Sequence, residues 1–259
     1  MGILNVTPDS FSDGGLFDAL ETALEQARRM IAEGAAIIDV GGESTRPGAS
    51  PVTAEEEQMR VLPVIDALAR EGKALISIDT YREDTARKAV AAGAHIVNDV
   101  WGAQREPGIA RVAAATGAGF VIMHTGRERQ KDPDVVVDQF VFLDRSVEIA
   151  RAAGVRDEQI VLDPGFGFAK DPDENFALIA RFEELGAFRL PFLVGTSRKR
   201  FIGQATGRDA AHRDAGTATT SAILRLKGAA LFRVHDVAIN VDALAIADAI
   251  LAATPKPDR

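Results

Sequence analysis

Residues 35–42 read Ala35-Ala-Ile-Ile-Asp-Val-Gly-Gly42, an apolar run that is too short for a helix and ends in two glycines. The residues before it, 18–33, carry apolar side chains at helical spacing on one face, at Leu20, Leu24, Ala27 and Ile31. Another short apolar run, Gly2-Ile-Leu, opens the chain. Strand, helix and strand therefore follow one another, and this unit decides the fold because it recurs.

The recurring unit predicts the fold class. Short apolar runs lie at residues 2–4, 35–40, 75–78, 96–97, 120–123, 160–162, 192–194 and 231–234. Helices are expected at residues 18–33, 54–70, 82–92, 109–115, 135–153, 172–185, 210–227 and 237–252. Continuous apolar strands that alternate with helices indicate a parallel sheet covered by helices. Eight such units in about 250 residues predict an α/β fold, a single-domain (β/α)8 TIM barrel over residues 1–259, with a doubly wound open sheet as the alternative.

The composition excludes several classes of function. The chain has no cysteine, which excludes disulfides, thiolate nucleophiles and cysteine-bound metals. It has no run of about 18 apolar residues and no basic segment followed by an apolar one at its start, so we expect a cytoplasmic protein with no membrane partner. The net charge of -8 argues against a nucleic-acid partner, so an anionic ligand needs a local cluster of cations. Because the chain starts directly on a strand, we also expect that residues precede Met1.

Nearly every apolar run ends in a polar or charged residue at its carboxyl end. These residues are Asn5, Asp39, Asp79, Asn98, Asp99, His124, Asp163, Ser197, His235 and Asp236. In a barrel the carboxyl ends of the strands lie on one face, which is where such folds place their active sites. We therefore expect many of these side chains, His124 included, to line one pocket. His95 and His212 are expected to be structural.

The stretch Asp163-Pro-Gly-Phe-Gly-Phe-Ala-Lys170 places a carboxylate at the end of a buried strand. Such a carboxylate can accept two parallel hydrogen bonds from a planar amidine-like edge, although a helix cap or a structural ion pair is also consistent with it. Asp79 and Asn98 add an acceptor and a mixed donor and acceptor, so the three could read the edge of a heterocycle such as a pterin. Two carboxylates could instead act as the general acid and base of a glycosidase.

Cations gather in the last two loops. Gly195-Thr-Ser-Arg-Lys-Arg-Phe-Ile-Gly203 follows the seventh strand, where such barrels often bind phosphate. Lys199 could bind an oxygen of the ligand, form a Schiff base or belong to a solvated basic patch, and its place in a loop favours recognition. Arg233 and His235 lie two apart and point to the same side of the last strand, which predicts a fork for an oxyanion such as diphosphate.

Two long polar loops follow the first two strands. They read Thr7-Pro-Asp-Ser-Phe-Ser-Asp-Gly-Gly15 and Gly41-Gly-Glu-Ser-Thr-Arg-Pro-Gly-Ala49. Their glycines permit hinge motion, so the pair predicts a lid over the mouth of the barrel, with two inert surface loops as the alternative. Asn5, just before the first loop, is either a capping residue or a ligand contact.

The order of these motifs resembles that of the dihydropteroate synthase family. The match includes Asn5 to Gly15, Gly42-Glu-Ser-Thr-Arg-Pro-Gly48, Ile78-Asp-Thr80, Asn98-Asp99, Met123-His124, Asp163 to Phe168, Ser197-Arg-Lys199 and Arg233-Val-His-Asp236, and it spans nearly the whole chain. Two departures are a shorter segment at residues 125–134 and fewer residues before the first strand. The resemblance implies a (β/α)8 barrel, a homodimer, and the condensation of 6-hydroxymethyl-7,8-dihydropterin diphosphate with para-aminobenzoate in folate synthesis.

The resemblance also implies roles for individual residues, including an SN1-like loss of diphosphate helped by Lys199, Asp79, Arg233 and His235. The residues expected at the pterin are Asp79, Asn98, Met123, Asp163, Phe168 and Lys199. Those expected at the diphosphate are Asn5, Thr45, Arg233 and His235, with Asn5 also binding Mg2+. Those expected at para-aminobenzoate, and at sulfonamide inhibitors that mimic it, are Phe11, Asp13, Arg46, Pro47 and Ser197.

Two other functions use a similar barrel. A pterin-binding methyltransferase acting on methyl-tetrahydrofolate shares the pterin-facing aspartate and asparagine, but it has no need of Arg233 with His235 or of the loop that carries Thr45. A pterin-binding barrel without catalysis predicts the loss of Asn5, Lys199 or the long loops, and all of these are present.

Overall fold

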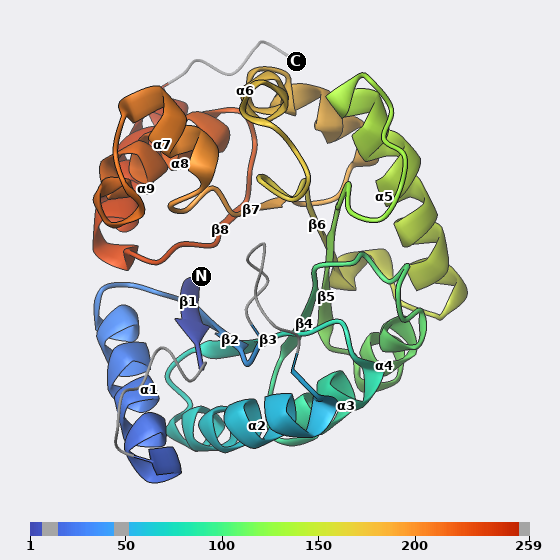
Figure 1. Ribbon diagram of the computed structural model, residues 1–259, viewed down its shortest axis with the longest axis vertical. Helices are drawn as coiled ribbons and strands as arrows, with labels where there is room; N and C mark the ends of the chain where they lie inside the picture. Colours follow the sequence, from blue (N-terminus) through green and yellow to red (C-terminus); the bar gives the residue numbers. More distant parts are fainter. Residues whose placement is uncertain (7–14, 44–51, 254–259) are drawn as a thin grey trace.

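The computed structural model describes residues 1–6, 15–43 and 52–253, and it has the strands at its centre and the helices around them (Figure 1). Within these residues the strands are β1 (Gly2–Asn5), β2 (Ile37–Gly41), β3 (Leu75–Asp79), β4 (Ile96–Asp99), β5 (Gly119–Met123), β6 (Ile160–Asp163), β7 (Leu193–Val194) and β8 (Leu231–Phe232). All eight predicted strands are therefore found, although β7 and β8 are short.

The helices form the outer ring of the molecule (Figure 1). They are α1 (Gly15–Ala32), α2 (Ala54–Glu71), α3 (Glu83–Ala91), α4 (Gly108–Thr116), α5 (Val135–Ala152), α6 (Pro172–Ala180), α7 (Arg200–Thr206), α8 (Asp214–Leu226) and α9 (Val237–Ala253). The described residues also contain three 3-10 helices, η2 (Asp157–Gln159) before β6, η3 (Phe182–Phe188) before β7 and η4 (Ala210–His212) before α8. In this part of the chain no helix is long and apolar enough to cross a membrane.

The strands close into a barrel. β1 to β6 pair in parallel and in chain order, and β7 pairs with β8. Single bridges join the two groups at Leu162 with Phe192 and at Gly2 with Val234. The second junction is held by the Ile3 amide, which donates to the Val234 carbonyl at 2.9 Å. The (β/α)8 barrel is therefore confirmed, and the alternative of an open sheet is wrong.

The strand register brings the polar ends of the first strands together. Asn5 lies opposite Gly41, Gly41 opposite Asp79, and Asp79 opposite Asn98. Between β5 and β6, Met123 lies opposite Asp163. Because neighbouring parallel strands are about 4.8 Å apart, Asn5, Gly41, Asp79 and Asn98 form a row at the carboxyl end of the barrel. Asn98 lies opposite Val121, so Met123 and Asp163 lie two residues further along their strands.

Local capping explains where the well-predicted helices start. α2 begins after Thr53, which forms a capping box with Glu56. α6 begins after Asp171, which caps the amide of Glu174, with Pro172 as its first residue. The apolar faces of the helices then pack on the strands in one continuous hydrophobic core.

Two predicted helices and one predicted loop differ from the structure. The helix expected at residues 172–185 ends at Ala180 and continues as η3, and the one expected at 210–227 is divided into η4 and α8. A short helix, α7, occupies part of the segment 195–203, which was expected to be a loop. The 3-10 and α periods differ too little over one or two turns for apolar spacing to separate them.

Candidate active site

Arg233 bridges two carboxylates inside the carboxyl end of the barrel. It follows β8, and its Nε donates to Asp39 Oδ2 at 2.6 Å while its Nη2 donates to Asp79 Oδ2 at 2.7 Å. Asn98 from β4 reaches the same place, with its Nδ2 at 3.3 Å from Asp39 Oδ2. Arg233 is 194 positions from Asp39 and 154 positions from Asp79 in the chain, yet the three side chains meet in one polar cluster.

Burial and mutual charge set the electrostatics of this cluster. Burial raises the pKa of Asp79 to about 7, and Arg233 only partly opposes this shift. Burial also disfavours the charge on Arg233, but Asp39 and Asp79 outweigh it and raise the pKa of the guanidinium. Arg233 therefore stays charged, while Asp79 can gain or lose a proton near neutral pH.

Asp163 lies buried at the end of β6, as predicted, but it is already engaged by its own loop. Its Oδ1 accepts a hydrogen bond from the Gly165 amide at 2.7 Å. Burial raises its pKa to about 6, opposed by that amide and by Lys199. Oδ1 thus holds the loop after β6, and because an ionised carboxylate can accept about four hydrogen bonds, the expected contact with a ligand stays a prediction.

Lys199 and Phe168 face each other across the pocket. The Lys199 Nζ lies 4.3 Å from the centroid of the Phe168 ring, and the Arg127 guanidinium lies 4.7 Å from the same ring. Burial, together with Arg233, lowers the pKa of Lys199 to about 8. A Cβ on Gly167 would lie 3.0 Å from Lys199 Cδ, so only a glycine lets the lysine stem pass this closely.

His235 contacts Ser197 at the rim of the site. The Ser197 Oγ is 2.9 Å from His235 Nδ1 and accepts from the His235 amide at 3.1 Å. Arg233 is instead directed at Asp39 and Asp79. Arg233 and His235, which are predicted to form a fork for an oxyanion, therefore contact different partners.

Asn5 and Asp79 both lie next to Gly41, at the ends of the strands on either side of it. A Cβ built on Gly41 would lie 3.7 Å from Asp79 Oδ2 and 3.9 Å from Asn5 Oδ1. Met123 is buried at the end of β5. The other predicted residues, Phe11, Asp13, Thr45, Arg46 and Pro47, lie outside the described residues.

The remaining histidines do not line the pocket. His124 is fully buried, with Nε2 at 3.0 Å from Asp138 Oδ2 and Nδ1 at 2.8 Å from Lys170 Nζ, so the expectation that it faces the pocket is wrong. Burial, with Lys170 nearby, lowers the pKa of His124 to about 3. The His95 Nδ1 accepts from the Ile76 amide at 3.1 Å, in agreement with a structural role. His212 is exposed beside Asp209.

Two buried charged residues, Asp39 in the polar cluster and Lys170 behind it, have partners that the sequence does not predict. Asp39 was noted only as a polar end of a strand, although a carboxylate inside a fully buried strand requires a cation nearby. Lys170 is the last residue of the stretch Asp163 to Lys170 and is buried, but its place in the sequence indicates no partner. Their partners, Arg233 and His124, are distant in the sequence, so the pairings themselves could not be read from it.

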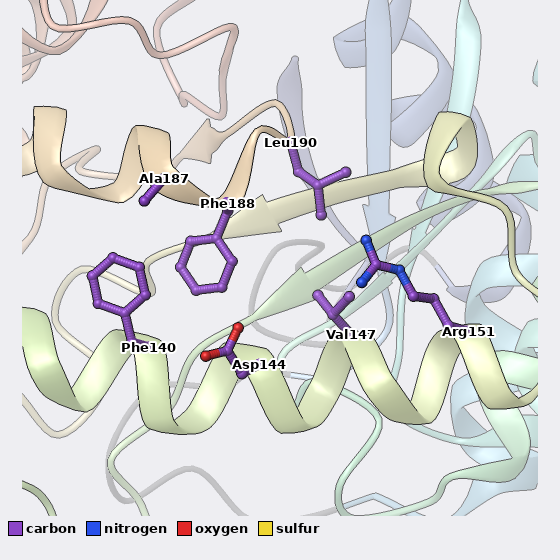
Figure 2. A pocket seen from close by; sticks show the side chains of 7 residues that line it. All are labelled: Phe140, Asp144, Val147, Arg151, Ala187, Phe188 and Leu190. Atoms are coloured by element: carbon purple, nitrogen blue, oxygen red, sulfur yellow. The ribbon is translucent and has the colours of Figure 1, made fainter.

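A hollow of about 260 Å³ lies elsewhere, on the outer ring between α5 and η3 (Figure 2). Phe140 and Phe188 stack at its edge, with their ring centroids 4.8 Å apart. Its lining comes from these two outer elements and the chain that follows η3, not from the carboxyl ends of the strands. It is therefore separate from the polar cluster.

Comparisons with known proteins agree with this geometry. The family model described as "Pterin binding enzyme" matches residues 1–235. The dihydropteroate synthase of Bacillus subtilis is 48% identical over 237 residues, 92% of this chain and 83% of the relative. The solved structure of the Xanthomonas albilineans dihydropteroate synthase with 4-aminobenzoic acid is 43% identical and has a TM-score of 0.93, covering 98% of this chain and 93% of that one.

A second solved relative, the Yersinia pestis dihydropteroate synthase with a sulfonamide drug, is 42% identical with a TM-score of 0.90, covering 98% of this chain and 94% of that one. These matches cover nearly the full chain at an identity at which the fold and family are shared. The chain therefore belongs to the pterin-binding enzyme family, among its dihydropteroate synthases.

Proposed function

We propose that this dihydropteroate synthase, acting as one domain over residues 1–259, holds the pterin with the polar row at the barrel mouth. Asp163 and Asp79 accept hydrogen bonds from the N–H groups of the ring. Asn98 both donates to and accepts from the polar edge of the ring, and Lys199 donates a hydrogen bond to a ring acceptor. The apolar groups beside the ring are Met123 and Phe168. The observations that support the proposal are that Asp79 accepts from Arg233 at 2.7 Å, that Asn98 lies beside Asp39, the other partner of Arg233, and that Asp163 and Arg233 both act on the charge of Lys199.

The diphosphate lies at the same mouth, held by Arg233, His235 and Thr45. Mg2+ usually keeps several waters and binds one or two protein oxygens together with substrate phosphates. Asn5 and Asp79 end β1 and β3 on either side of Gly41 and offer oxygens of the kind that Mg2+ binds, and Asp79 Oδ2 also accepts from Arg233. Asn5 holds the ion in this proposal. When bound, Mg2+ neutralises charge on the diphosphate.

Para-aminobenzoate binds above the pterin, in a pocket formed by Phe11, Asp13, Arg46, Pro47 and Ser197. Ser197 is the described member of this set, and its contact with His235 joins the pocket to the diphosphate side. The relatives that hold 4-aminobenzoic acid and a sulfonamide support this use of the pocket. Sulfonamides are expected to compete for it.

The reaction is an SN1-like displacement at the exocyclic carbon of the pterin. The C–O bond to the diphosphate breaks first, and the charge of Arg233 stabilises the electron pair that leaves with the oxygen. The amine nitrogen of para-aminobenzoate then adds its lone pair to the carbon and releases one proton. Because this lone pair is already available at neutral pH, no strong base is needed. Lys199 and Asp79 act by holding the ring and its charge.

Two alternatives are less well supported. A methyltransferase acting on methyl-tetrahydrofolate has no use for an arginine placed beside the pterin-binding carboxylate, as Arg233 lies beside Asp79. A barrel that only binds pterin predicts the loss of Asn5, Lys199 or the long loops, and the sequence keeps all of them. We further propose a homodimer and a cytoplasmic location for this enzyme.

The test of the proposal is Asp163→Asn. Asparagine keeps the oxygen that accepts from the Gly165 amide, so the loop is retained, but it replaces the ligand-facing oxygen with a donor. We expect the pterin to bind about 2 to 4 kcal/mol more weakly, as titration calorimetry would measure.

The control for this test is Asp157→Asn, which changes an exposed aspartate that pairs with Arg151. Its pterin affinity should equal that of the wild type. An unchanged dissociation constant in Asp163→Asn would remove this residue from the pterin site and refute the proposal.

A further inference from the structure

Two lysines outside the proposed substrate-binding set join the loops that follow β5 and β6. Lys170, in the loop after β6, reaches back to the end of β5, where its Nζ is 2.8 Å from His124 Nδ1; it also donates to the Gly165 carbonyl at 3.0 Å. Lys131, in the loop after β5, reaches forward and donates to the Ala169 carbonyl at 2.8 Å. The two loops are thus linked in both directions.

The loop after β6 has a backbone that needs such support. Gly165 and Gly167 have φ angles of 63° and 77°, and Ala169, which has a side chain, has a φ of 52°. A left-handed conformation costs an L-residue with a Cβ about 1 to 2 kcal/mol. Lys131 binds the carbonyl of that same alanine, and the Gly167 amide donates to Asn175 Oδ1 at 2.7 Å. Side-chain bonds therefore stabilise a conformation that the backbone disfavours.

The partner of Lys170 is itself held rigidly. The His124 ring is fully buried and lies 3.0 Å from Asp138 Oδ2, and Arg129 makes two further bonds to the same carboxylate at 2.6 and 2.8 Å. Arg129 Nη2 also lies 2.9 Å from His124 Nε2, and Lys170 Nζ lies 2.8 Å from Nδ1, so both ring nitrogens are engaged by neighbouring side chains. Lys170 is thus anchored to the barrel wall and not to the pocket.

The supported loop carries groups of the pterin pocket. The Phe168 ring lies 4.3 Å from Lys199 Nζ, and the Gly165 amide holds Asp163 Oδ1. A shift of this loop would move Phe168 against Lys199 and disturb the acceptor Asp163. Hydrogen bonds form only within a narrow range of donor–acceptor distances, so a shift of a fraction of an ångström in these side chains would weaken their bonds to the pterin.

We propose that Lys170 and Lys131 are positioning residues, which hold the loop after β6 in the conformation that pterin binding requires. They act through Phe168, Asp163 and Lys199 and do not themselves touch the substrate. This inference rests on the proposed roles of those three residues in pterin binding.

The experiment compares Lys170→Met, Lys131→Met and the matched control Lys227→Met. Lys131 and Lys227 have side chains that are 29% and 23% exposed, and each donates to one backbone carbonyl and one glutamate. Lys227 makes its contacts at Ala180 and Glu183, away from the loop after β6. The pterin dissociation constant, the KM for para-aminobenzoate and the kcat per active site are measured for each variant.

Loss of the buried bonds in Lys170→Met should raise the pterin dissociation constant about tenfold. Loss of the half-buried pair in Lys131→Met should raise it about threefold. In both variants the KM for para-aminobenzoate should stay within about twofold of the wild type, and Lys227→Met should leave all three quantities unchanged. A merely structural role would lower the active fraction and the melting temperature without this selective effect on pterin.

An unchanged pterin affinity in Lys131→Met, or a loss equal to that of Lys227→Met, overturns the inference, and this holds even if Lys170→Met fails to fold. Equal losses for pterin and para-aminobenzoate also overturn it. Failure of the underlying pterin assignment is recognised separately, because Asp163→Asn would then bind pterin as tightly as the wild type. If Asp163→Asn loses affinity and Lys131→Met does not, only the positioning role is wrong.

Discussion

The protonation of Lys199 gives a test at the scale of one residue. Burial and Arg233 lower its pKa to about 8, so the ammonium loses its proton as the pH rises through this value. A charged donor binds a ring acceptor more strongly than a neutral one, and pterin affinity should therefore fall above a pH of about 8.

Lys199→Arg separates this effect from other titrations. Arginine keeps its charge throughout the accessible range, so the alkaline loss of pterin affinity should disappear, although the overall affinity should be lower because the guanidinium is planar and larger. Calorimetric titrations from a pH of about 6.5 to about 9.5 would measure both curves. Ionisation of the ligand is common to both proteins and cancels in the comparison. The same alkaline fall in the variant would show that another group is responsible.

Individual residues also show where sequence reasoning stops. The positions of Asp79, Asn98 and Asp163 were predictable because each lies at the carboxyl end of a strand, and a parallel barrel gathers these ends on one face. Lys199 lies at the end of the loop after β7, directly before α7. The pairing of Asp39 with Arg233 was not predictable, since the two lie 194 positions apart and only the closed barrel brings them together.

The loop after β6 gives a test at the scale of a structural element. Gly165 has a φ of +63°, and a Cβ there would lie 1.9 Å from the His124 carbonyl oxygen. Gly165→Ala should thus lower the free energy of unfolding by about 1 to 2 kcal/mol because of the left-handed backbone. The forced contact with the His124 carbonyl should lower it by about 1 to 3 kcal/mol more. Urea unfolding at neutral pH would measure the free energy of unfolding.

Gly117→Ala is the matched control for the backbone contribution. Gly117 caps α4 with a φ of +75°, and no heavy atom lies within 4 Å of the position its Cβ would take. The free energy of unfolding of Gly117→Ala should fall by only about 1 to 2 kcal/mol. Equal losses in the two variants would mean that the close approach to His124 contributes nothing to stability.

The sequence predicted which helices and strands are present better than it predicted where the helices end. The capping residues Thr53 and Asp171 fixed the starts of α2 and α6, because a side-chain acceptor at a helix start is a local property. The break after Ala180 and the helix at Arg200–Thr206 were not predicted. Short turns of this kind depend on packing against neighbouring helices, which the local sequence does not contain.

At the scale of the whole molecule, α9 is unusual among the outer helices. Its 17 residues include only two charged side chains, Asp242 and Asp248. A helix that is apolar on all sides is normally buried, yet Ile246 is 65% exposed and Ile250 49% exposed. α8 packs against α9 and adds exposed Ile223 and Leu226. This face is the natural place for the second subunit of the proposed homodimer.

Ile246→Glu tests this placement of the dimer. A charge at the centre of an apolar interface should weaken association by at least about 2 kcal/mol, and sedimentation equilibrium should show a shift from dimer to monomer. The control is Val141→Glu on α5, where the native side chain is 62% exposed and so equally free to take a charge. It should leave the dimer intact. A wild-type monomer, or a dimer that dissociates with Val141→Glu and not with Ile246→Glu, would contradict the prediction, because the apolar face of α9 would then have no part in assembly.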